Sequence, residues 1–214
     1  MRTEQLIADL ATRTGRTAPL RSPFVRFAGW CAAAICCAAL AMLVFGPRRN
    51  LAHVVAQPWF IASAVLAIGT AAMAALASLA LAVPGAGRSA VMRASAFVLL
   101  SAWSVPAAVS VIRAGHGLSD ASDWYVCFVR VILIGLIPAG LLFGMLRRAF
   151  PLSLGSTGAL GALGAMAVGS ATIQFVCPLD VPSHGLLGHL GPALLLCGLG
   201  AWTAARLLKP SLRL

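Results

Sequence analysis

The feature that most constrains this chain is a series of six long stretches that are almost free of charge. They cover residues 27–45, 59–83, 94–112, 124–146, about 155–175 and about 186–205. A helix needs about 20 consecutive apolar residues to cross the hydrocarbon core of a membrane. We therefore predict an all-α, polytopic membrane protein with six transmembrane helices.

The composition excludes the main alternatives to a membrane protein. Hydrophobic residues make up 60% of the chain and charged residues only 10%, whereas a soluble domain carries about 25% charged residues. The chain is also far too apolar for intrinsic disorder. Its net charge of +11 would suggest nucleic-acid binding in a soluble protein. In a membrane protein it indicates orientation instead, so no direct nucleic-acid partner is expected.

The distribution of basic residues predicts the topology. Of the 16 Lys and Arg residues, 12 fall on the side that holds both termini. By the positive-inside rule, both termini are then cytoplasmic. We predict a cytoplasmic partner-binding segment at 1–23, a transmembrane domain at 24–207 and a cytoplasmic tail at 208–214. The first span is expected to be a retained anchor in a multi-pass protein of the cell inner membrane, because no convincing cleavage site is present.

Small residues predict close packing between the spans. The fifth span contains Gly155, Gly161, Gly164 and Gly169. Glycines in transmembrane helices let neighbouring backbones approach one another closely. We interpret these glycines as packing positions.

The predicted topology places most of the polar chemistry on the outer side. The histidines there are His53, His116, His184 and His189, the acidic residues Asp120, Asp123 and Asp180, and the cysteines Cys127 and Cys177. Cys127 opens the fourth span and Cys177 follows the fifth. Since these are consecutive antiparallel helices, their outer ends can be neighbours.

We therefore predict that Cys127 and Cys177 form a functional pair, able to form a disulfide if the outer compartment is oxidising. With His184 and His189 they also form a candidate metal site. His184 and His189 are five residues apart, so they do not share one face of a regular α-helix, and idle interfacial histidines remain an alternative. Arg130 either favours the Cys127 thiolate or extends to lipid phosphate or an outer carboxylate.

The remaining cysteines have a different setting. Cys31, Cys36, Cys37 and Cys197 lie at apolar depth in the first and sixth spans. A buried cysteine is mostly a small hydrophobic residue. The vicinal pair Cys36 and Cys37 leaves a soft-metal site open as an alternative.

The N-terminal segment is the longest part outside the predicted spans. Residues 3–11 have the pattern of a short helix in which Leu6, Ile7 and Leu10 share one face. So short a helix is unstable alone in water, so this face is expected to bind a partner's groove or membrane lipid. No cytoplasmic segment is long enough for a catalytic core. We therefore expect no enzymatic activity and no cofactor other than a transient heavy-metal ion.

Several motifs together resemble the NrsF-type membrane anti-sigma factors. They are T-x-x-L-I-x-x-L-A at 3–11, LAVPG at 81–85, DWYVC at 123–127, CPLD at 177–180, and His189 with Pro192. Their order and spacing carry the resemblance over nearly the whole chain. One position departs from the family pattern, because Val176 stands where members often carry His before the second cysteine.

The resemblance implies a signalling protein. The inner segment would sequester an extracytoplasmic-function sigma factor, and Cys127 and Cys177 would release it under heavy-metal or oxidative stress. Three rival functions remain open on the residues alone, and the simplest is a membrane interaction protein without sensing. A metal transporter or permease requires a polar path at membrane depth, where only Arg130 is charged. A thiol oxidoreductase requires a vicinal or CxxC pair at the outer face, and the sequence has none there.

Overall fold

The computed structural model describes residues 3–13, 20–83, 89–115, 123–149, 151 and 153–207. The helices are α1 (Thr3–Arg13), α2 (Pro23–Phe45), α3 (Leu51–Val54), α4 (Pro58–Leu81), α5 (Ser89–Ala114), α6 (Trp124–Arg147), α7 (Leu154–Gln174), α8 (Pro182–His184), the π-helix η2 (Gly185–Leu190) and α9 (Gly191–Leu207). Within these ranges there is no strand, so the described part of the chain is all-α.

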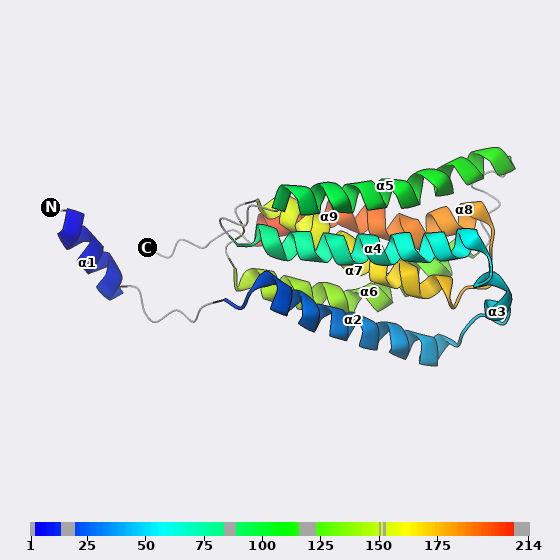
Figure 1. Ribbon diagram of the computed structural model, residues 1–214, viewed down its shortest axis with the longest axis horizontal. Helices are drawn as coiled ribbons and strands as arrows, with labels where there is room; N and C mark the ends of the chain where they lie inside the picture. The colour runs from blue at the N-terminus through cyan, green and yellow to red at the C-terminus, as the bar shows by residue number, and fades with distance from the viewer. Residues whose placement is uncertain are drawn as a thin grey trace.

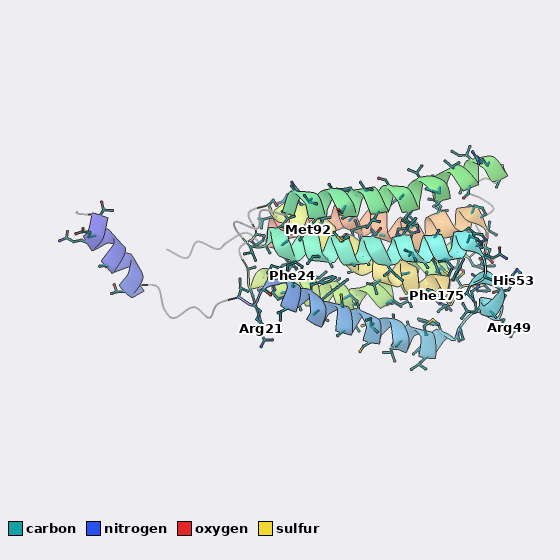
Figure 2. The ribbon with its side chains drawn as sticks, viewed as in Figure 1. Arg21, Phe24, Arg49, His53, Met92 and Phe175 are labelled. Carbon is teal, nitrogen blue, oxygen red and sulfur yellow. The ribbon has the colours of Figure 1, made fainter. Side chains whose placement is uncertain are left out.

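Six helical segments are long and apolar enough to cross a membrane, which confirms the predicted number. They are α2, α4, α5, α6, α7 and the continuous segment α8–η2–α9. Figure 1 shows them side by side in one bundle. Figure 2 shows Arg21 and Phe24 at the end where α2 begins, and Arg49 and His53 at the opposite end. We call that opposite end, where α6 also begins, the cysteine end. Its placement on the outer side of the membrane remains a prediction.

Several helices extend beyond the charges that bounded the predicted spans. α2 begins at Pro23, before Arg26, because Ser22 caps it: the Ser22 hydroxyl accepts a hydrogen bond from the Val25 amide at 3.4 Å. α5 likewise continues past Arg93 at one end and Arg113 at the other. Charged residues near a membrane surface are compatible with helix when their long side chains reach a polar partner.

The fifth span, α7, lies at the centre of the bundle and packs against α4, α6 and α9. A Cβ atom added at Gly164 would lie 2.9 Å from the backbone nitrogen of Ala75 on α4, and one added at Gly169 would collide with the Val131 carbonyl on α6. These two glycines therefore have the packing role predicted for them, and they bring α7 into backbone contact with two neighbours.

The packing between α7 and α9 depends on a glycine pair that the sequence analysis did not identify. A Cβ on Gly158 would collide with the Gly200 carbonyl, and one on Gly200 would lie 2.6 Å from the Gly158 carbonyl. A Cβ added at Gly155, by contrast, would lie 3.9 Å from the Ala201 carbonyl oxygen, an ordinary contact, so close packing does not require glycine there.

Candidate functional site

Four side chains that could bind a metal converge at the cysteine end. They are Cys127, Cys177, His184 and His189, and their ligand atoms all lie within 4.8 Å of one another. Cys127 comes from the first turn of α6, and Cys177 from the segment between α7 and α8. His184 ends α8 and His189 lies in η2. The structure thus brings together the four residues that the sequence analysis grouped as one site.

The site is almost completely closed. His184 is 0% exposed, Cys177 2%, Cys127 4% and His189 9%. The Cys177 sulfur lies 3.3 Å from His184 Nε2. The two imidazole rings meet edge to face, with their centres 5.3 Å apart. Both cysteines are free thiols, so the cluster presents two sulfurs and two imidazoles to one small volume.

Cys177 lies outside the membrane-spanning helices, and its surroundings favour the thiolate. A hydrogen bond from the Cys127 side chain, with a further contribution from His184, holds the pKa of the Cys177 thiol below its ordinary value even though burial opposes this shift. A thiolate is the form of cysteine that attacks an oxidant or binds a metal ion. The surroundings of Cys177 therefore suit it to either reaction.

The two histidines lie on the same side of their helical segment because that segment is not a regular α-helix. In an α-helix, residues five apart are separated by about 140° around the axis, because each residue turns about 100°. Residues 185–190 form instead a π-helix, whose hydrogen bonds join residues five apart. His184 and His189 therefore face the same side. The prediction that they do not share one face applied to a regular α-helix, and the segment between them is not one.

Arg48 forms hydrogen bonds to the segment that carries Cys177. This role was not predicted from the sequence. Its backbone amide donates to the Phe175 carbonyl at 3.0 Å. Its guanidinium donates to the Asp180 carboxylate at 2.5 Å and to the Pro178 carbonyl at 3.4 Å. The Arg48 side chain is only 2% exposed. Arg48 and Asp180 both fall on the predicted outer side of the membrane, so their opposite charges were the sequence feature that could have predicted this ion pair.

Other predicted outer residues lie elsewhere. His53 is exposed on α3 (Figure 2) and does not belong to the cluster. The Arg130 guanidinium lies 4.9 Å from the centre of the Phe45 ring, an arrangement that neither prediction for Arg130 included. His116 and Asp120 fall outside the described residues.

The cysteines of α2 and α9 are also outside the cluster. Cys31, Cys36, Cys37 and Cys197 are free and exposed or half-buried at the bundle surface. At the N-terminus, α1 confirms the predicted helix. The side chains of Leu6, Ile7 and Leu10 lie outside what the structure describes, so their role as a binding face remains a prediction.

Comparison with known protein families gives a match for most of the chain. A family model described as NrsF, negative regulator of sigma F, matches residues 10–209. The searches of curated proteins and of solved structures gave no match. The family match includes all six spans and all four residues of the cluster. This chain belongs to the NrsF family of negative regulators of sigma F.

Proposed function

We propose that this chain is an inner-membrane anti-sigma factor that sequesters an extracytoplasmic-function sigma factor. Cys127 and Cys177 act as its sensor, and their reaction with heavy metals or oxidants releases the sigma factor. The observation that carries the proposal is the convergence of two free, buried thiols, one on α6 and one on the segment after α7, in a member of a family of sigma regulators. A regulatory family also supports a non-enzymatic role.

The chemistry of the pair suits such a sensor. An oxidant that accepts two electrons and two protons converts the two thiols into one disulfide, with the Cys177 thiolate as the attacking group. A soft metal ion would instead bind both sulfurs and displace their protons. Because the ligand atoms lie within 4.8 Å of one another, either reaction needs only local movement before it constrains α6 against the segment after α7.

The first helix is the proposed binding element for the sigma factor. α1 runs over Thr3–Arg13 with Glu4 in its first turn, a position that favours a negative charge. The period of the sequence puts Leu6, Ile7 and Leu10 on one face. An amphipathic helix of this kind binds a partner by laying its apolar face in a groove.

Hydrogen bonds join the helix that carries Cys127 to the first half of α2. α6 begins beside the cluster with Cys127, and near its far end the Met145 carbonyl accepts a hydrogen bond from the Arg26 guanidinium at 2.5 Å. Nearer the middle of α6, the Pro138 carbonyl accepts a hydrogen bond from the Trp30 indole at 3.0 Å. Arg26 and Trp30 belong to α2, which follows the N-terminal segment in the sequence. A shift of α6 would therefore move the start of α2.

The test is retention of the sigma factor by the full-length membrane protein, purified before and after treatment of cells with cadmium or diamide. We expect the untreated protein to retain the sigma factor and both treatments to release it. Cys127→Ser and Cys177→Ser should each blunt the release, and the double variant should resemble either single variant, because the pair acts as one unit.

The matched control is Cys197→Ser, a half-buried cysteine in α9, which should respond like the wild type. Deletion of residues 1–20 should abolish retention altogether. An undiminished release in either sensor variant would remove the paired-thiol mechanism. Retention that survives the deletion would remove the N-terminal segment as the binding site.

A further inference from the structure

We propose that Cys127, Cys177, His184 and His189 form a tetrahedral site that holds one Zn²⁺ ion in the resting protein. The sensor would then be a preassembled zinc centre, from which softer ions displace zinc and oxidants expel it. The regulatory meaning rests on the proposed function, whereas zinc binding itself is an independent property of these four side chains.

The donor set selects zinc over the common hard cations. Two sulfurs and two imidazole nitrogens are a recurrent ligand set of structural zinc sites, whereas Ca²⁺ and Mg²⁺ require oxygen ligands. No carboxylate belongs to the cluster of four. Two thiolates also neutralise one divalent ion, so the complete site carries no net charge. This matters because the four side chains are at most 9% exposed and a buried net charge is costly.

The distances fit a tetrahedral ion after a small contraction. Zinc–sulfur bonds of about 2.3 Å and zinc–nitrogen bonds of about 2.0–2.1 Å place tetrahedral ligand atoms about 3.3–3.8 Å apart. The Cys177 sulfur and His184 Nε2 already lie 3.3 Å apart. The widest separation in the cluster is below 4.8 Å, so the remaining ligands need to move by about 1 Å, which side-chain rotation supplies.

The imidazole ring of His189 has a buried nitrogen that is suited to binding a metal ion. Its Nε2 atom is buried and has no hydrogen-bond partner in the described part of the chain. A buried polar atom without a partner is unfavourable and calls for a specific explanation. A zinc bond to an imidazole nitrogen would pair one of the two ring nitrogens directly.

The backbone around the histidines is specialised for this convergence. The π-helix brings His184 and His189 to the same side, and π-helical turns occur frequently at functional sites. The Ser170 hydroxyl on α7 donates to the His189 carbonyl at 2.6 Å, which anchors the turn to the centre of the bundle. A Cβ at Gly188 would lie 2.9 Å from the Trp124 carbonyl and 3.3 Å from the Cys127 Cβ. Glycine therefore allows η2 to reach α6 beside Cys127.

A cavity provides an entry path. It has a volume of about 640 Å³, and His189 forms part of its wall together with Gln174, Asp180 and Trp59. Asp180 is 39% exposed, and its carboxylate, paired with Arg48, lines the same cavity as His189. An ion entering beside Asp180 would meet His189 before the sulfurs.

The experiment uses the full-length protein in detergent, purified from cells grown with zinc. Its metal content is measured by mass spectrometry, and the zinc is then replaced by Co²⁺. We expect about one zinc per chain and the intense absorption of tetrahedral, thiolate-bound cobalt. The sensor cysteines should react with maleimide only after a chelator removes the metal. A metal-free wild type, or cobalt bound without thiolate absorption, would overturn the proposal.

Variants test the ligand set. His189→Gln and Cys177→Ser should each weaken zinc binding at least tenfold, whereas the matched controls His53→Gln and Cys197→Ser should bind like the wild type. Equal losses in controls and site variants would contradict the assignment. Should a site variant misfold, the maleimide protection of the wild-type thiols still decides the question.

The two proposals fail in distinguishable ways. If the wild type contains no zinc but cadmium still releases the sigma factor through the cysteines, the zinc centre is refuted and the proposed function stands. If zinc is bound by the four residues but no sigma factor is retained, the proposed function is refuted and the zinc centre stands.

Discussion

Gly188→Ala should separate the π-helix from α6 without changing any ligand. The added Cβ would lie 2.9 Å from the Trp124 carbonyl oxygen and 3.3 Å from the Cys127 Cβ. The carbonyl is backbone in the first turn of α6 and cannot rotate away, so η2 must move outward. Gly185→Ala is the matched control, because it lies in the same π-helix with nothing within 4 Å of its added Cβ.

Overpacking of this kind costs about 1–3 kcal/mol. If that cost falls on the approach of η2 to Cys127, metal affinity should fall by roughly 5- to 150-fold, because about 1.4 kcal/mol corresponds to tenfold. Competition between the protein and a chromophoric chelator for Zn²⁺ or Co²⁺ measures this change. We expect Gly185→Ala to match the wild type. Equal affinities for Gly188→Ala and Gly185→Ala would refute the claim that close packing of η2 on α6 assembles the site.

Three further predictions concern topology, partner binding and the support of the Cys177 segment. After chelation, Cys127 should react with a membrane-impermeant maleimide in cells permeabilised only at the outer membrane; labelling that requires inner-membrane lysis would reverse the orientation. Changing Leu6 and Leu10 to Asp should reduce sigma affinity more than tenfold in a pull-down titration, since each buried side chain contributes about 1.5–3 kcal/mol; unaltered binding would exclude this face. Arg48→Met should destabilise the protein by about 1–3 kcal/mol in thermal unfolding, whereas Arg49→Met, at an exposed position, should not. Equal melting temperatures for the two variants would show that the ion pair between Arg48 and Asp180 contributes little.

The number of spans could be predicted from sequence because hydrocarbon thickness imposes a length and a composition that a single chain reveals. The ends of the spans were harder to predict from the sequence. Arg26 was taken as a boundary, yet it lies inside α2, 8% exposed, with its guanidinium on the Met145 carbonyl. A charged residue marks the end of a span only when its side chain reaches no polar partner. The partner of Arg26 belongs to a helix more than a hundred residues away in the sequence.

The candidate site was predictable as a set but not as a geometry. Topology alone assigned both cysteines and both histidines to one side of the membrane. The convergence of His184 and His189 depends on a π-helix, which a rule based on 3.6 residues per turn cannot anticipate. The position of Cys177 depends on Arg48, whose role is visible only once the α2–α4 connection folds against the end of α7.

The central claim is that reaction of the paired cysteines releases a bound sigma factor. The most direct measurement is the amount of sigma factor that co-purifies with the full-length protein from cells before and after cadmium treatment. It compares the wild type, the double variant Cys127→Ser and Cys177→Ser, and the control Cys36→Ser. We predict that cadmium releases the sigma factor from the wild type and from the control but not from the double variant. Equal release from all three proteins would contradict the claim.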